Sequence, residues 1–276
     1  MDAVHVNDSL RMMSADLDLQ AGDDGVSVTG ENGLLYIESG CLRIESADNG
    51  IAAMSTVLFA GGNLSLNAAN NAVHTAGLFN MIGGEITADA GNDGLKADTG
   101  ISISGGSLNI TAADKGICTD GTLRVEAGDI TVDAGDDGIA ATGEIAVSGG
   151  SLTVNAYDDG IHSDTSVVVS GGVIKIPACY EGIEAVTIDI SGGEIEIFPE
   201  DDGINANGGG DAFGGMGDDP GWQRGEEMRQ AIRNGERPEG DENGAQPEAP
   251  EGMEFPMNME PGERPERPEG DDNGAQ

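Results

Sequence analysis

The chain has 276 residues and a formal net charge of −39, from 51 acidic against 12 basic side chains. So acidic a chain argues against nucleic acid as a partner, because phosphate binding needs a basic surface. No apolar run approaches the roughly 18 residues of a membrane-spanning helix, so no membrane span is expected. Aromatic residues make up only 3% of the chain while glycine contributes 46 residues. This composition indicates a narrow core of Ile, Val, Leu and Ala.

From its N-terminus onward the chain carries two small-residue columns with one spacing. The first column has ten members, separated by 22 residues except for one step of 25 and one of 21. The second column has eight glycines in the same register. Two independent columns with one period indicate an internal repeat. The first column is Ala3, Gly25, Gly50, Ala72, Gly94, Gly116, Gly138, Gly160, Gly182 and Gly203, and the second is Gly40, Gly62, Gly84, Gly106, Gly128, Gly150, Gly172 and Gly193.

Each repeat contains three short runs in which apolar and polar residues alternate, as in Leu152, Val154 and Ala156. Alternation with period two is typical of β-strands, and runs bounded by Gly or Asp are too short for helices. Inward-facing side chains at equal positions of adjacent coils should then stack into ladders, so that Leu152 packs on Ile130, one period earlier. We therefore predict an all-β fold, a right-handed, single-stranded parallel β-helix (a solenoid) of about ten 22-residue coils in residues 1–207.

Two segments depart from the repeat. The three extra residues between Gly25 and Gly50 fall near residues 31–33, in a turn, where a solenoid tolerates added length. Residues 208–276 are rich in Gly, Pro, Glu and Met, and 237–246 nearly recur as 267–276. Such a composition buries too little apolar surface to offset chain entropy. We predict a disordered acidic tail or insertion there, with one short helix near 225–233.

Two further columns of the repeat, which pass through Asp136 and Asp137, are rich in acidic residues. Stacking places equal positions of adjacent coils about 4.8 Å apart, where two carboxylates repel by roughly 3.5 kcal/mol at an effective dielectric constant of 20. A cation between them would relieve this repulsion, and Ca²⁺ fits because it takes about six to eight oxygen ligands in flexible geometry. The expected metal ligands, in the region richest in carboxylates, are Asp93, Asp98, Asp114, Asp120, Asp136, Asp137, Asp158, Asp159 and Asp164.

Three further points bear on the calcium interpretation. Zn²⁺ would need His or Cys in the cluster, and the columns have almost none. Lys115 replaces one Asp, so its ammonium is expected to act as a built-in cation. Asp-Gly and Asn-Gly are also common turn formers, so solvated turns alone could account for the columns. A third acidic column, which consists of Asp98, Asp120 and Asp164, argues against solvated turns alone, because a turn does not require acidic residues at those positions.

The chain resembles the β-helical carbohydrate-binding domain proteins of Gram-positive bacteria. The resemblance rests on the repeated Asp-Asp-Gly-Ile turn followed by a Val/Ile-x-Val/Ile-Ser-Gly-Gly strand, over about residues 2–207. That family is similar to the calcium-containing pectate-lyase β-helices. The resemblance implies Ca²⁺ in the acidic turns, binding of cellulose or acidic pectic glycans, and an extracellular or cell-surface location. The sequence departs from the pattern at residues 70–72, at Lys115 and at residues 180–181.

The function expected is calcium-dependent polysaccharide binding. A parallel sheet face with polar residues such as Thr131 and Thr153 would suit an extended polymer, with Tyr36, Tyr157 and Tyr180 as the available aromatics. One alternative is a calcium-dependent polysaccharide lyase, which needs a base to remove a proton. Its candidate bases are Lys96, Lys115 and Lys175, and Lys96 shares an outward column with His5, His74, Cys118 and His162. Another alternative is a structural adhesin or stalk without glycan affinity. No catalytic or glycan-contacting residue is assigned.

Overall fold

The computed structural model describes residues 1–206, and these contain 22 β-strands and no helix. No segment in this part of the chain is a helix that could cross a lipid bilayer. Every strand pairing in it is parallel, so the predicted all-β parallel solenoid is confirmed. The predicted tail at 208–276, its short helix at 225–233 and residue 207 lie outside the described residues.

Three parallel sheets form the walls of the solenoid, and each coil contributes one strand to each sheet. The first sheet contains β1 (Val4–Val6), β4 (Val26–Val28), β7 (Ile51–Ala53), β10 (Val73–Thr75), β13 (Leu95–Ala97), β15 (Ile117–Thr119), β17 (Ile139–Ala141), β22 (Ile204–Asn205) and the first parts of β20 (Ile161–Cys179) and β21 (Ile183–Pro199).

The second sheet follows along the chain, and the third sheet closes the coil. The second sheet contains β2 (Leu10–Met12), β5 (Leu34–Ile37), β8 (Thr56–Phe59), β11 (Leu78–Met81), β18 (Ile145–Val147), the first parts of β14 (Gly100–Ala112) and β16 (Thr122–Ala134), and the middle parts of β20 and β21. The third sheet contains β3 (Ala15–Ala21), β6 (Gly40–Ser46), β9 (Asn63–Ala68), β12 (Glu85–Ala90), β19 (Ser151–Asn155) and the last parts of β14, β16, β20 and β21.

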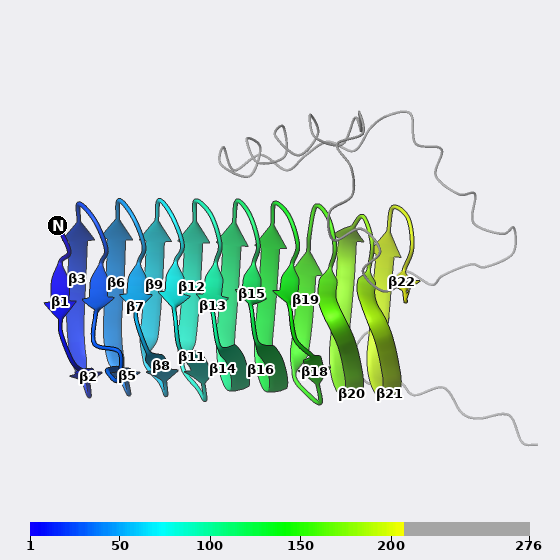
Figure 1. Cartoon of the computed structure of the whole chain (residues 1–276), viewed down its shortest axis with the longest axis horizontal. Coiled ribbons are helices and arrows are strands. Elements are labelled where there is room, and N and C mark those ends of the chain that lie inside the picture. Colours follow the sequence, from blue (N-terminus) through cyan, green and yellow to red (C-terminus); the bar gives the residue numbers. More distant parts are fainter. Residues whose placement is uncertain (207–276) are drawn as a thin grey trace, which may run out of the picture. The chain divides into compact units, whose positions relative to one another are not determined.

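The coils stack in register along one axis, from β1 to β22 (Figure 1). The first sheet contains ten stacked positions, from Val4 to Ile204. Ten positions enclose nine intervals, so the solenoid has about nine coils of roughly 22 residues, close to the predicted number of about ten. The longer coil adds its three residues between β4 and β5, in the turn at residues 31–32, as predicted.

The core is a set of apolar ladders between the three sheets. Leu152 pairs with Ile130 and Ile161 with Ile139, as the alternation predicted, and all four side chains are almost completely buried. The larger buried residues include Phe59 and Phe79 in the second sheet. Since each layer is narrow and repeats the one below, aliphatic side chains fill it with few aromatics.

The corner between the second and third sheets explains the second glycine column. All eight of its glycines have positive φ angles, between 83° and 109°. L-residues with a Cβ rarely adopt this left-handed region. At Gly128, a Cβ would also lie 3.0 Å from the carbonyl oxygen of Gly106. The corner therefore requires glycine for its backbone angle and for the close approach of the neighbouring coil.

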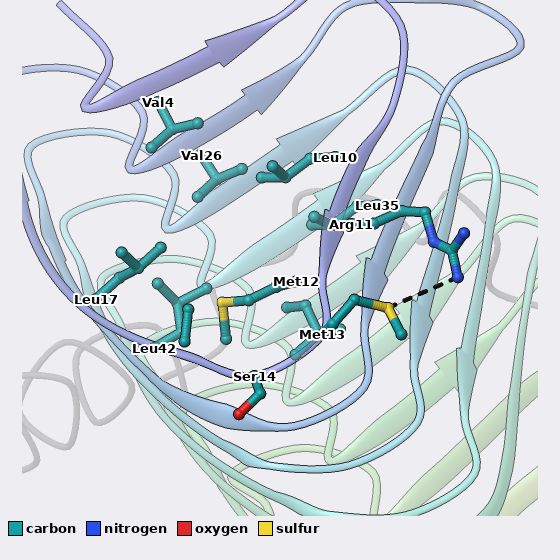
Figure 2. A pocket seen from close by; sticks show the side chains of 12 residues that line it. Val4, Leu10, Arg11, Met12, Met13, Ser14, Leu17, Val26, Leu35 and Leu42 are labelled. Carbon is teal, nitrogen blue, oxygen red and sulfur yellow. Dashed lines mark hydrogen bonds between the residues drawn. The ribbon is translucent and has the colours of Figure 1, made fainter.

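The first two coils of the solenoid carry the apolar side chains that line a cavity. Strands β1, β2 and β3 each pair with one neighbour within residues 1–206. A cavity of about 350 Å³ lies there. Figure 2 shows apolar side chains such as Leu10, Met12 and Leu42 around it, with Arg11 turned toward Met13 Sδ.

Candidate metal and carbohydrate site

The acidic turn of each coil links the third sheet to the first sheet of the next coil, and it carries two neighbouring columns. The inner column contains Asp24, Asn49, Asn71, Asp93, Lys115, Asp137, Asp159, Glu181 and Asp202. The outer column contains Asp23, Asp48, Asn70, Asn92, Asp114, Asp136, Asp158, Tyr180 and Asp201. The backbone of this turn is tied to the next coil, for example by the Gly138 amide donating to the Asp159 carbonyl over 2.8 Å.

The inner column also ties adjacent coils together through its side chains. Asp137 Oδ1 accepts a hydrogen bond from the backbone amide of Asp159 over 3.3 Å. Asp93 Oδ1 accepts one from Lys115 over 3.3 Å, and Asp24 Oδ1 accepts one from Asn49 over 3.2 Å. One carboxylate oxygen of each of these Asp residues therefore has a structural role, which explains why the position favours Asp or Asn.

The second oxygen of three inner-column Asp residues faces a cation. Asp93 Oδ2 lies 3.2 Å from Lys96 Nζ, and Asp159 Oδ2 lies 2.8 Å from His162 Nδ1. The ammonium group of Lys115 contacts Asp137 Oδ2. These three Asp side chains are buried, and a buried carboxylate requires a compensating partner. The inner column thus has a built-in cation in three of its turns.

Lys115 behaves as its place in the acidic column predicted. Its Nζ lies 2.9 Å from Asp136 Oδ2 and also contacts Asp137. Those two carboxylates raise the pKa of Lys115 above its usual value against the opposing effect of burial. The turn still carries excess negative charge. Partial desolvation and the neighbouring Asp137 and Asp136 carboxylates raise the pKa of Asp158 to about 6.

Three groups of side chains in residues 1–206 place potential metal-binding atoms within 4.8 Å of one another. One consists of Asp136, Asp137 and Asp158, all of which belong to the predicted ligand set. Another joins the predicted Asp159 to His162 and Glu184, and the last consists of Asp23, Asp24 and Asp48. The prediction did not name these last three, His162 or Glu184 as ligands, although His162 and Glu184 are separated by one 22-residue period.

The other predicted ligands lie outside these groups. Asp93 pairs with Lys96, as described above. Asp98 Oδ1 lies 3.3 Å from His74 Nε2, and Asp164 Oδ1 lies 3.2 Å from His162 Nε2. Asp114 is half-buried in the outer column, and Asp120 is exposed beyond β15. The structure therefore places three of the nine predicted residues in one potential metal-binding group and Asp159 in another, and it gives Asp93, Asp98 and Asp164 basic partners.

The outward column of the first sheet contains His74, Lys96, Cys118 and His162, as predicted. Cys118 is nevertheless buried. Burial, followed by the nearby Asp93 carboxylate, raises the pKa of the Cys118 thiol to about 12. Lys96 also has a raised pKa, because Asp93 outweighs the opposing effect of burial. A lysine that holds its proton this firmly is a poor general base.

The third sheet presents an uncharged polar stripe to solvent. The stripe consists of Ser65, Thr87, Asn109, Thr131 and Thr153, which are paired in register on five successive coils. Arg43 precedes the stripe and Lys175 follows it. A second outward stripe runs beside it, one step nearer the acidic turn, and contains Asn67, Asp89, Thr111, Asp133 and Asn155. The sheet thus offers a repeated set of hydrogen-bonding groups next to the acidic turns.

Comparison with known families resolves the class of this protein. A family model described as carbohydrate-binding domain-containing protein matches residues 1–138 and, in a second overlapping match, residues 92–218. The chain belongs to this carbohydrate-binding domain family. No curated protein sequence and no solved structure matches the chain.

Membership of the carbohydrate-binding domain family supports a polysaccharide as partner. The aromatic side chains of this family member are few and scattered. Tyr36 lies on the second sheet with the Arg11 guanidinium 5.2 Å from its ring centre. Tyr157 is half-buried and Tyr180 is 48% exposed, both beside the acidic turn. Phe198, which was not among the predicted aromatics, is 60% exposed at the end of β21.

Proposed function

We propose that this chain is a calcium-dependent polysaccharide-binding module for acidic pectic glycans or cellulose, outside the cell or on the surface of a Gram-positive bacterium. The observation that carries the proposal is the convergence of carboxylates from adjacent coils in the acidic turns, next to the polar stripe of the third sheet. The Gram-positive and extracellular assignment rests on the sequence resemblance described above.

The donor atoms in the acidic turns suit calcium. Asp24 uses Oδ1 to hold the next coil, as Asp93 and Asp137 of the inner column do. No Lys, Arg or His side chain among residues 1–206 pairs with Asp24, which has Asp23 and Asp48 close by. The fully exposed Met1 ammonium lies 3.6 Å from Asp23 Oδ2. An all-oxygen set of this kind fits Ca²⁺ better than a softer metal. Lys115 supplies an ammonium group to the turn of Asp136 and Asp137. No side-chain cation among residues 1–206 does the same for the turn of Asp24, so we expect a metal ion there.

A second calcium position is the Asp136, Asp137 and Asp158 group from the predicted ligand set. Lys115 already neutralises part of its charge, yet the raised pKa of Asp158 indicates residual repulsion. Ca²⁺ at this group would share the carboxylates with the ammonium. We therefore expect weaker binding here than at Asp23, Asp24 and Asp48, because the partly buried Lys115 ammonium lies 2.9 Å from Asp136 whereas the fully exposed Met1 ammonium lies 3.6 Å from Asp23. The nearer and less solvated cation opposes an incoming ion more strongly.

The polar stripe is the proposed glycan platform. A polymer laid along the solenoid axis meets a hydroxyl or amide group about every 4.8 Å, the spacing between neighbouring strands. With a net charge of −39, the chain would repel an acidic glycan, and Ca²⁺ shared between turn carboxylates and uronates would reverse that repulsion. Cellulose carries no charge, so its binding would rest on the stripe alone.

The binding function is favoured over a lyase. Lys96 and Lys115, two of the three candidate bases, are held by carboxylates that raise their pKa values. A lyase base must instead be able to accept a proton near neutral pH. Lys175 lies on the third sheet next to the polar stripe, 3.9 Å from Glu196, and Glu196 belongs to none of the three potential metal-binding groups found in residues 1–206.

The test is a binding titration of the chain with polygalacturonate and with cellulose, in calcium and in excess EDTA. Retention of polygalacturonate in calcium and its loss in EDTA, without unsaturated sugar products, is the expected result. Appearance of unsaturated products would replace the binding function by a lyase. Absence of binding to both glycans in calcium would overturn the proposal and favour a structural stalk.

A further inference from the structure

We propose that Asp159, His162 and Glu184 form a binding site for a divalent transition-metal ion of the zinc class, distinct from the calcium positions. The site lies at the first sheet, where His162 and Glu184 are paired in register on adjacent coils. Asp159 approaches from the acidic turn that precedes β20. Three residues from two rigidly stacked coils therefore converge on one place.

The donor atoms of the three side chains lie close enough to share one ion. His162 Nδ1 is 2.8 Å from Asp159 Oδ2 and 3.0 Å from Glu184 Oε2. An ion bound at about 2.0–2.2 Å by nitrogen and carboxylate oxygen separates its ligands by somewhat more than these distances. Modest outward rotation of the side chains is enough to admit it. Asp159 is buried, while about a quarter of the His162 and Glu184 side chains remains exposed, which leaves a route for the ion.

A contact outside the three ligands also supports metal binding by His162. The other ring nitrogen of His162, Nε2, lies 3.2 Å from Asp164 Oδ1. Metal-binding histidines almost always donate their second ring N–H to a carboxylate or carbonyl, which fixes the ring and increases its basicity as a ligand. Asp164 thus acts as a positioning residue. It fixes the tautomer in which Nε2 keeps its hydrogen and Nδ1 is available to the metal.

Comparison along the column shows that this arrangement occurs at one histidine. His74 is followed on the next coil by Lys96, and His5 is followed by Ser27. Only His162 has a carboxylate, Glu184, at the paired position of the next coil. The carboxylate near His74 is Asp98, which contacts Nε2 and has no second carboxylate grouped with it in residues 1–206. The inner-column residue three positions before His74 is Asn71, whereas before His162 it is Asp159. A lysine or an amide at these positions removes a metal ligand, so His74 serves as an internal control.

The chemistry of the donors selects the class of metal. Imidazole nitrogen suits Zn²⁺ and neighbouring transition metals, whereas Ca²⁺ prefers an all-oxygen set. Without metal, the His162 imidazolium is the cation that neutralises Asp159 and Glu184. A divalent ion would displace one proton from Nδ1 and leave the carboxylates bound to a larger charge. Three protein ligands also leave one coordination position open for water or for a glycan carboxylate.

The experiment is a titration of the EDTA-treated, dialysed chain with ZnCl₂ by calorimetry, with millimolar calcium present to occupy the oxygen-only positions. Co²⁺ provides a second measurement, because its visible absorption reports nitrogen and oxygen ligands directly. The variants are His162→Gln, Glu184→Gln and Asp164→Asn, and the matched control is His74→Gln. Circular dichroism and thermal unfolding verify that each variant keeps the solenoid. The Co²⁺ spectrum of the unmodified chain remains informative if His162→Gln fails to fold.

We expect one Zn²⁺ per chain in calcium, at least about 100-fold weaker binding in His162→Gln and Glu184→Gln, and about 10- to 100-fold weaker binding in Asp164→Asn. His74→Gln should bind as the unmodified chain does. Equal Zn²⁺ affinity in His162→Gln would overturn the proposal, as would a loss in His74→Gln of the same size. Failure of the unmodified chain to bind Zn²⁺ or Co²⁺ would also overturn it. None of these outcomes affects the glycan proposal, which is measured separately.

Discussion

The ammonium nitrogen of Lys115 lies 2.9 Å from Asp136 Oδ2 on the following coil, in the middle of the acidic turns. It also contacts Asp137, so one lysine neutralises both columns of the next turn. Elsewhere Lys96 and His162 neutralise Asp93 and Asp159 from the first sheet, three residues further along the same coil. The acidic turns are therefore partly balanced by the protein itself, and calcium is expected where that balance is missing.

Replacing Lys115 by Gln should increase calcium binding at Asp136, Asp137 and Asp158. Removal of the ammonium returns the full carboxylate charge to an incoming ion, so we expect roughly tenfold tighter binding or more. In the absence of calcium the variant should lose about 1–2 kcal/mol of unfolding free energy, a value reduced because Lys115 is partly exposed. Calorimetry and calcium-free thermal unfolding measure the two effects. Lys175→Gln is the matched control, because its nearest carboxylate oxygen is 3.9 Å away on an exposed sheet.

The polar stripe can be tested by adding a charge to it. Thr131→Glu should weaken polygalacturonate binding about tenfold or more, because the new carboxylate lies beneath the acidic polymer. Ala146→Glu adds the same charge to the outward face of the second sheet, in register with Arg124, and should have little effect. Both are measured by affinity electrophoresis in calcium. Equal losses in the two variants would place the glycan elsewhere.

The stability cost of replacing a glycine of the first column by alanine is expected to depend on the size of the side chain packed against it. A Cβ at Gly94 would lie 2.3 Å from Ile110 Cγ2. In the preceding coil, Ala72 takes the place of Gly94, and the smaller Ala88 takes the place of Ile110. Gly94→Ala should therefore cost about 1–3 kcal/mol by overpacking. Combined with Ile110→Ala, which alone should cost about 2–5 kcal/mol, it should cost about 0.5–3 kcal/mol less than the sum. Denaturant unfolding of the four proteins measures this coupling, and strict additivity would contradict it.

The corner glycines should tolerate no side chain. Gly128 has φ of 109°, so Gly128→Ala should destabilise the solenoid by at least about 1–2 kcal/mol through the left-handed backbone alone. Gly22→Ala is the control, because the nearest atom to its Cβ would be 3.9 Å away and its φ is not in that region. Thermal unfolding should show a clear drop for the first variant and almost none for the second.

The three cysteines should differ in reactivity. Cys41 is exposed, whereas Cys118 and Cys179 are buried. Burial, with Asp93 and Asp159 respectively as further contributions, raises the thiol pKa to about 12 for Cys118 and about 11 for Cys179. Since the thiolate is the reacting species, iodoacetamide at pH 8 should modify Cys41 alone in the native chain and all three in denaturant. Mass spectrometry reads the modified sites, and fast labelling of native Cys118 would contradict the packing of the first sheet.

The repeat pattern was enough to predict the parallel solenoid, the register of its ladders, the place of the longer coil and the contact of Lys115 with the acidic turns. It could do so because coils stacked in register turn a spacing of 22 residues directly into a column in space. The same rule places Glu184 above His162, a relationship that the sequence contains outside its acidic columns. The ten members of the first column enclose about nine coils, close to the number that the repeat predicts.

The contacts that each side chain makes within its column depend on three-dimensional packing. Asp93, Asp137 and Asp159 share one column, yet Lys96, Lys115 and His162 reach them from different positions. Cys118 faces outward but is buried by its neighbours. Periodicity fixes where a Cα lies, whereas rotamers, neighbouring charges and burial decide which oxygen meets which cation. For that reason the columns were predictable and the groups Asp23–Asp24–Asp48 and Asp159–His162–Glu184 were not.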